Sequence, residues 1–163
     1  MTYSIEVVGG WQVMGADGQL LRVRHPVQRL LAFLVLRGRI HQRALVAGTL
    51  WPESSERRAS ANLRSTLWHA RSESPGIVDG DGSTVWLCED VHTDFDVAAE
   101  TIRTALAGQP VSLRDLAELH DDLLPGWDDE WVLPLRFLHR QLRLLALERV
   151  GRDAPVTTSS PVC

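Results

Sequence analysis

Arginine, asparagine, serine and histidine side chains are concentrated in one stretch of the chain, residues 57–74. On a helix of 3.6 residues per turn, Leu63, Leu67 and Ala70 of this stretch fall on one side. The other side then carries groups that hydrogen-bond to nucleic acid, since Arg pairs with guanine, Asn with adenine, and Ser or Thr with a base or a phosphate. The pattern favours a helix that enters a nucleic-acid groove over the alternative of a solvated basic helix.

The candidate binding residues are the polar side chains of this stretch and one tryptophan. Those expected at base edges are Arg58, Asn62, Arg64, Ser65, Trp68 and His69, and those expected nearer the phosphates are Arg57, Thr66 and Arg71. Trp68 has two open roles, which are contact with a thymine methyl group and packing under a neighbouring hairpin. An ordinary surface helix would pair its charges with more acidic residues, whereas only Glu73 follows Glu56 here.

The charge is distributed unevenly along the 163 residues. The whole chain has a net charge of −4, which by itself argues against a nucleic-acid partner. Residues 1–74 nevertheless hold ten arginines and five acidic residues, a net charge of +5, and residues 75–163 carry −9. A basic amino-terminal half joined to an acidic half indicates two tasks, one of which faces phosphate.

The residues around the basic stretch predict the elements that position it. Alternating β-rich segments predict an antiparallel sheet of three strands at 3–8, 11–14 and 20–23. Helices are expected at 26–38 and at 41–51, the latter with Leu45, Val46 and Leu50 facing inward. Ser54 or Ser55 can then cap the third helix, 57–74.

A hairpin is predicted directly after the third helix. The turn sequence DGDGST separates two short apolar segments within 77–87. Three helices followed by a hairpin are typical of a winged helix-turn-helix, whose third helix enters the major groove. The sequence therefore predicts an α+β fold with a winged helix-turn-helix, followed by a short all-α region.

Several of these segments resemble a known family. RLLA at 29–32, LWP at 50–52, ANLR at 61–64 and VHTD at 91–94 are similar to the OmpR-type winged helix of the Streptomyces antibiotic regulatory proteins, the SARP group. DLLPGW at 122–127 and the segment that follows resemble the start of the bacterial transcriptional activator domain of that group. The resemblance covers about residues 4–150, and the LWP and ANLR segments are its most specific part.

The resemblance implies a DNA-binding regulator of a biosynthetic gene cluster. Its members bind direct-repeat sites beside a promoter and contact RNA polymerase. By position, the recognition helix would be 59–72, and the hairpin at 77–87 would lie along the adjacent backbone or minor groove. The wing carries Asp79 and Asp81, which phosphate would repel, so we expect weak contacts from its tip. The helical region is shorter than the activator domain of the family.

The carboxy-terminal half predicts further helices, at 96–107, from Ser112 onward and at 133–150. The last is the most apolar, with Leu135, Leu138, Leu142 and Leu145 on one seam, widened by Phe137, Leu144 and Leu147. That surface either packs within the monomer or forms a homodimer contact. The acidic residues 128–130 form either a solvated turn or a surface for a polymerase subunit or other partner.

The sequence predicts a winged domain at 1–92, an activator-like or dimerisation region at 93–151, and a disordered tail at 152–163. No motif for catalysis, phosphate binding or metal ligation occurs, so we expect no enzymatic activity, cofactor or metal. The absence of a signal peptide or membrane helix indicates a cytoplasmic protein. The alternative function is a protein-interaction module that pairs with a full-length relative or RNA polymerase without strong DNA binding of its own.

Overall fold

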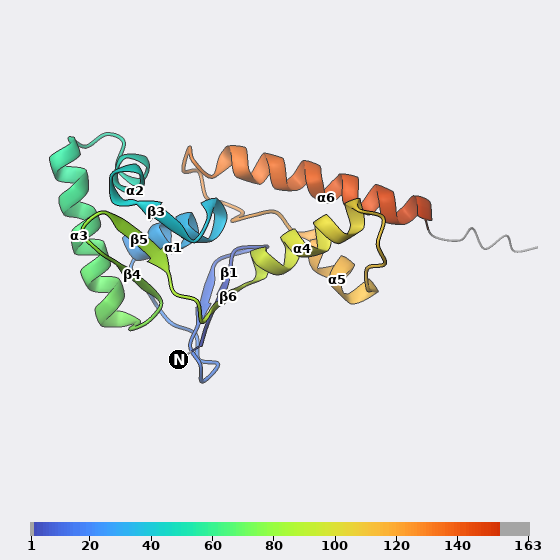
Figure 1. Cartoon of the computed structure of the whole chain (residues 1–163), viewed down its shortest axis with the longest axis horizontal. Coiled ribbons are helices and arrows are strands. Elements are labelled where there is room, and N and C mark those ends of the chain that lie inside the picture. Colours follow the sequence, from blue (N-terminus) through green and yellow to red (C-terminus); the bar gives the residue numbers. More distant parts are fainter. Residues whose placement is uncertain (1, 154–163) are drawn as a thin grey trace, which may run out of the picture.

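The computed structural model describes residues 2–153, which form the predicted α+β fold. In chain order the elements are β1 (Tyr3–Glu6), β2 (Gln12–Met14), α1 (His25–Arg37), β3 (Ile40–Gln42), α2 (Arg43–Leu50), α3 (Glu56–Glu73), β4 (Val78–Gly80), β5 (Thr84–Leu87), β6 (Val91–Thr93), α4 (Asp94–Leu106), α5 (Leu113–Ala117), a 3-10 turn (Glu118–His120) and α6 (Leu133–Asp153). Figure 1 shows α2, α3 and the β4–β5 hairpin at one end of an elongated molecule, and α4, α5 and α6 toward the other.

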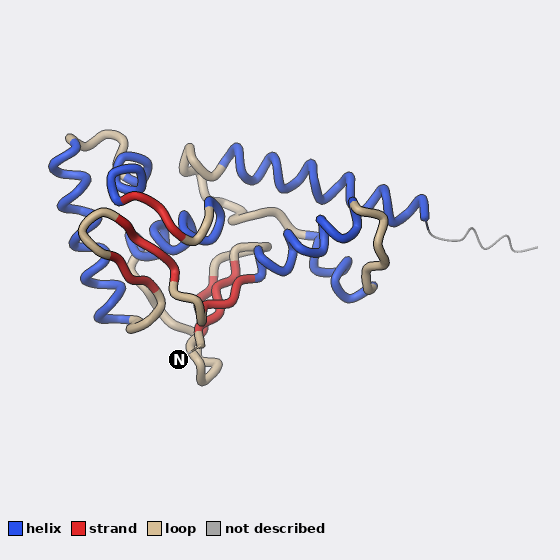
Figure 2. The backbone as a smooth tube through the Cα atoms, in the orientation of Figure 1, coloured by secondary structure: helices blue, strands red, loops and turns tan. Residues whose placement is uncertain are grey.

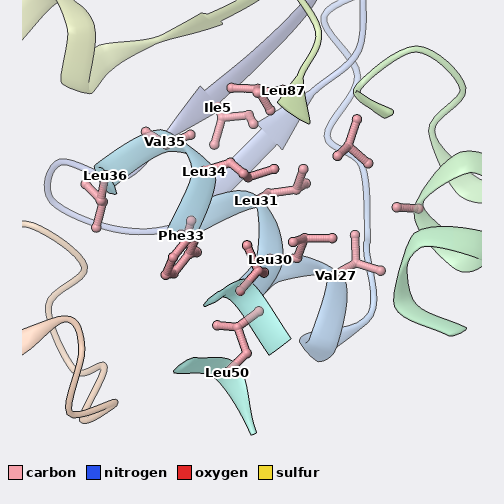
Figure 3. Packing of buried hydrophobic residues seen from close by; sticks show 14 of the residues in the cluster. Ile5, Val27, Leu30, Leu31, Phe33, Leu34, Val35, Leu36, Leu50 and Leu87 are labelled. Atoms are coloured by element: carbon pink, nitrogen blue, oxygen red, sulfur yellow. The ribbon is translucent and has the colours of Figure 1, made fainter. Parts of the chain in front are cut away.

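The main core is built around α1, which is apolar on nearly every side and is therefore buried. Pro26 starts it, since a first helical turn needs no backbone N–H there, and Gly38 ends it at a φ of 115°. Figure 3 shows Phe33 and its neighbours on α1 packed among residues from β1, α2 and β5. This helix therefore holds the two sheets and the helix-turn-helix together.

The first sheet differs from the predicted one. Its strand order is β2-β1-β6, and β6 pairs with β1 in parallel, so the sheet is mixed and not antiparallel. Figure 2 shows the strands of both sheets in red, between α3 and α4. The strand predicted at 20–23 was wrong, because only Leu20 bridges to Met14 and Val23 turns into the core. The third strand instead comes from a segment more than eighty residues away, which local turn signals cannot reveal.

The second sheet has the order β3-β5-β4 and contains the predicted hairpin. The helix predicted at 41–51 begins later, at Arg43, because Ile40–Gln42 pair with β5 as a strand. Leu45 was also misplaced, since 48% of it is exposed, whereas Val46 and Leu50 are buried as predicted.

The helices of the second half pack on one another through a smaller core. Thr93 caps α4 by accepting a hydrogen bond from the backbone N–H of Asp96 at 3.0 Å, and Ser112 caps α5 as predicted. Ile102 of α4 and Ala146 of α6 are buried together in this core. The helix α6 continues to Asp153, so the tail predicted from residue 152 starts at least two residues too early; residues 154–163 lie outside the described part.

The segment that leads into α6 belongs to the main core. Leu123, Leu124 and Val132 are buried there, and Arg29 of α1 forms an ion pair with Asp129 at 2.6 Å. Packing among the described residues leaves much of the apolar surface of α6 uncovered. Its exposed members are Leu133, Phe137, Leu138, Leu144 and Leu145.

Candidate nucleic-acid interface

The helix α3 is fixed to the body of the protein by one face. Leu63, Leu67 and Ala70 are at most 2% exposed, which confirms the apolar side predicted from their spacing, and Ala59 is buried with them. Ser55 begins the helix, because its side chain accepts a hydrogen bond from the backbone N–H of Arg58. The outer face of α3 therefore points away from the core at one end of the molecule (Figure 1).

Three arginines on the outer face of α3 are available to a partner. Arg57, Arg58 and Arg64 are exposed, and none has an ion pair with another of the described residues. Ser65 is exposed beside them, and Asn62 is half-buried. Unpaired guanidinium groups remain free for bidentate hydrogen bonds to carboxylate-like or phosphate oxygens and to guanine.

A groove of about 720 Å³ runs between α3, the start of α2 and the turn of the hairpin. Arg43, Ser60, Arg64, Ser83 and Thr84 line it with polar groups. The guanidinium group of Arg43 donates to the backbone carbonyl of Asp81 at 2.7 Å. The backbone N–H of Arg43 donates to the backbone carbonyl of Ser83. These bonds fix the hairpin turn relative to the start of α2.

The acidic residue at the hairpin turn is engaged by its own loop. The carboxylate of Asp81 accepts hydrogen bonds from the backbone N–H groups of Thr84 at 2.7 Å and Ser83 at 2.8 Å. These bonds, first that of Thr84, hold the pKa of the Asp81 carboxyl far below its usual value. Asp81 therefore shapes the turn and keeps its negative charge beside the groove.

Arg71 lies at the other end of α3 and is turned toward the hairpin. Its guanidinium group pairs with the carboxylate of Asp79 at 2.6 Å and donates to the backbone carbonyl of Gly80 at 2.8 Å. The sequence placed Arg71 near the phosphates, but in this structure its hydrogen-bonding groups are directed at β4. It connects α3 to the hairpin.

Thr66 was wrongly included among the outward-facing candidates. It is 4% exposed, and its hydroxyl donates to the backbone carbonyl of Asn62 at 2.9 Å. The reason is its spacing, because Thr66 follows Leu63 by three positions and precedes Ala70 by four, which places it on the buried seam. A phosphate cannot reach this hydroxyl.

Trp68 lies one helical turn beyond Arg64, and His69 lies on the side of α3 that faces away from the groove of Arg64. Trp68 is 64% exposed with its ring against that of His69 at 4.8 Å between centroids, so it does not pack under the hairpin. His69 borders a hollow of about 280 Å³ between α3 and the start of α1. Arg24 lies in this hollow, 3.4 Å from the His69 ring, and pairs with Glu73.

The sequence did not single out Arg24, Arg43, Ser83 or Thr84 as site residues. They come from the loop before α1, the start of α2 and the hairpin, so spacing within α3 carries no signal for them. Only the assembled fold places them beside Arg64 and His69. The closeness of Arg43 to the hairpin could have been inferred only from a known pairing of β3 with β5.

Within residues 2–153 no cluster of three or more His, Cys, Asp or Glu side chains could hold a metal ion. Over the same range, every helix is too short or too polar to cross a bilayer. No protein-family model and no curated protein matches the chain. The SARP resemblance therefore stays a hypothesis that depends on the quoted residues alone.

Proposed function

We propose that this protein is a sequence-specific DNA-binding regulator of transcription. The observation that carries the proposal is the outer face of α3, where three exposed arginines have no ion pair among the described residues and one of them, Arg64, lines a polar groove. A convex helix with free guanidinium groups fits the major groove of B-DNA, which is about 12 Å wide and admits one helix.

In this proposal some side chains contact base edges and others contact phosphates. Arg58 and Arg64 read guanine through paired hydrogen bonds, Asn62 reads adenine, and Ser65 bonds to either base or phosphate. Arg57 and Arg43 attract phosphate, and the stem of the hairpin contacts the flanking strand. The acidic groups at 79 and 81 limit the hairpin to contacts from its stem.

The resemblance to the SARP group extends the proposal to biological context. It suggests direct-repeat promoter sites near a biosynthetic gene cluster, contact with RNA polymerase and a cytoplasmic location. Of the acidic residues 128–130, Asp129 is held by Arg29, while Asp128 and Glu130 are exposed and free to meet a polymerase subunit. Neither the regulated genes nor the direction of regulation enters the proposal.

Fluorescence anisotropy with a labelled random duplex tests the DNA partner directly. We expect binding at about 50 mM salt that falls steeply by about 200 mM, because phosphate contacts release counterions. Replacing Arg57, Arg58 and Arg64 together by Ala should abolish it. The matched control replaces three exposed arginines elsewhere by Ala, namely Arg103, Arg114 and Arg152. It has the same net charge as the α3 triple variant.

Equal loss of binding in the two triple variants would show that charge and not the α3 surface drives association. No binding by the wild-type protein at low salt would overturn the proposal. Selection of bound duplexes from a random pool then gives the operator and the spacing of its repeats.

A second candidate function is protein interaction through α6. The observation that favours it is the exposed apolar surface of that helix, which includes Phe137 at 65% exposure. We propose that a second copy of the chain covers this surface, and the proposal is compatible with DNA binding because α3 lies at the opposite end of the molecule (Figure 1).

A further inference from the structure

A second concave surface lies far from α3, between α4 and α6. The two helices run side by side in the same direction (Figure 1), and a groove of about 360 Å³ follows them. Its walls are apolar and include Leu36, Phe95, Ile102, Leu106, Leu138 and Leu142. This volume lies in the range of sites that hold small molecules.

The groove is open to solvent along its mouth. Leu106 is 38% exposed and Leu138 is 54% exposed at its two rims, so apolar surface faces water there. Covering it with an apolar molecule would release that water, which is favourable. Apolar walls alone do not select a ligand, however, and the selecting group must be polar.

His139 is the polar group that selects. It lines the groove, is 6% exposed, and its ring lies 6.0 Å from that of Phe95. Its Nε2 atom is buried and has no hydrogen-bond partner among the described residues. A buried nitrogen without a partner destabilises the fold, so such atoms call for a specific explanation.

The surroundings of His139 favour its neutral form. Burial lowers the pKa of the imidazole, the positive charge of Arg143 lowers it further, and Asp122 opposes both. Arg103 also lies at the rim, where it pairs with Glu100. A neutral imidazole offers either a donor or an acceptor at Nε2, depending on its tautomer.

A hydroxyl group can form a hydrogen bond with either tautomer of His139, because it both donates and accepts. A carbonyl group can bond only to the tautomer in which Nε2 carries the proton. A cationic ligand would be repelled by Arg103 at the rim and would lose part of its hydration against the apolar walls. We propose that the groove between α4 and α6 binds a small, uncharged apolar molecule whose single hydroxyl or carbonyl group bonds to His139.

The probe is 1-octanol, titrated into full-length protein with ¹⁵N-labelled histidine and followed by NMR. We expect saturable binding with a shift of one histidine Nε2 resonance, which is absent in His139→Phe. Octylammonium, with the same chain and a positive charge, should bind at least about tenfold more weakly. Equal binding of the two probes, or a linear response without saturation, would overturn the proposal.

Paired variants test whether the probe binds in the groove. Ala99 lines the groove, so Ala99→Phe should fill it and abolish octanol binding, while Val97→Phe adds the same ring on the exposed face of α4 and should not. If Ala99→Phe fails to fold, Leu138→Gln at the rim carries the test, with Leu145→Gln as its match outside the groove. Unchanged binding in the groove variant would refute the site and leave the proposed DNA binding untouched.

Discussion

Arg64 differs from the other arginines of α3 because it faces both the outer surface and the groove beside the hairpin. If it reads a base, Arg64→Ala should weaken binding to the selected operator by about 1–3 kcal/mol, and discrimination at one position should relax. Anisotropy with operators altered one base pair at a time measures both effects. Arg114→Ala, at an 89% exposed side chain on α5, is the control and should bind normally. An unchanged Kd for Arg64→Ala would remove this residue from the interface.

We expect Asp79 to lower the affinity of the α3 surface for DNA, because it repels phosphate and forms an ion pair with Arg71. Asp79→Asn removes the negative charge and leaves the positive charge of Arg71 without its ion pair. We therefore expect tighter binding to random duplex, by a few-fold at low salt, and a salt dependence steeper by about one unit in the log–log slope. Glu118→Gln on the far side of the molecule changes the charge equally and should have a smaller effect. Weaker binding of Asp79→Asn would mean that the Arg71–Asp79 ion pair positions α3, and that this positioning matters more for DNA binding than the removed negative charge.

The contrast between Thr66 and Ser65 shows how far residue types predict a site. Both are polar residues of a basic stretch, but only Ser65 is exposed, because the helical period puts Thr66 in line with Leu63 and Ala70. Spacing therefore predicted the orientation of α3 better than residue type did. The contribution of Arg43 depends on a loop brought in by distant strands, and no local pattern could predict it.

At the scale of elements, helices were predictable because their signals are local. The period of α1, the cap of α3 at Ser55 and the turn of the hairpin all lie within a few residues of the element they define. The parallel pairing of β6 with β1 was missed because it joins segments far apart in sequence. Asp94 helps to hold that junction, since its carboxylate accepts backbone N–H bonds from Val7 and Val8 at 2.9 Å.

The junction before α6 makes a pH-dependent prediction. Asp122 accepts hydrogen bonds from Arg140, which lower the pKa of its carboxyl, and Arg143 adds to the effect. An acid whose pKa is lower in the folded state stabilises the fold above its unfolded pKa, and this stabilisation is lost as the pH falls through the folded pKa. Asp122→Asn should therefore lower the free energy of unfolding at pH 7 by about 1 kcal/mol, the scale of one partly solvated pair.

Urea denaturation of Asp122→Asn and wild type at several pH values measures this difference. We expect the two curves to differ near neutrality and to converge only at acid pH, as the pH falls through the lowered pKa of the Asp122 carboxyl. Glu118→Gln, whose partner Arg114 is 3.9 Å away at the surface, should show little difference at any pH. A constant gap down to the acid limit would mean that Asp122 acts through packing and not through its charge.

The whole molecule separates its charges by position. The net charge of −4 conceals a basic amino-terminal half that contains α3 and an acidic second half, of which α4, α5 and α6 lie toward the opposite end of the long axis from α3 (Figure 1). Because charges more than about 10 Å apart are largely screened at physiological salt, the acidic half does not cancel attraction at α3. The local distribution, and not the total, is the relevant quantity for a nucleic-acid partner.

The exposed face of α6 leads to a prediction about the assembled molecule. Leu133, Phe137 and Leu144 are spaced by four and seven residues, so they share one side of the helix, and each is about half exposed or more. In an antiparallel pair of α6 helices related by a two-fold axis, Phe137 of one copy faces Leu144 of the other. Such a self-complementary contact closes as a dimer and does not propagate.

Sedimentation equilibrium tests this arrangement, and we expect a concentration-dependent dimer in the micromolar range. Phe137→Glu should shift the protein to monomer, because a charge at the centre of the contact would be buried without a partner. Val97→Glu introduces the same charge at a 48% exposed residue of α4 and should leave the dimer intact. Since the contact lies on a different side of α6 from Leu138 and the groove, octanol binding should be unchanged in Phe137→Glu. If the wild-type protein stays monomeric at about 100 μM, the proposed dimer through α6 is wrong.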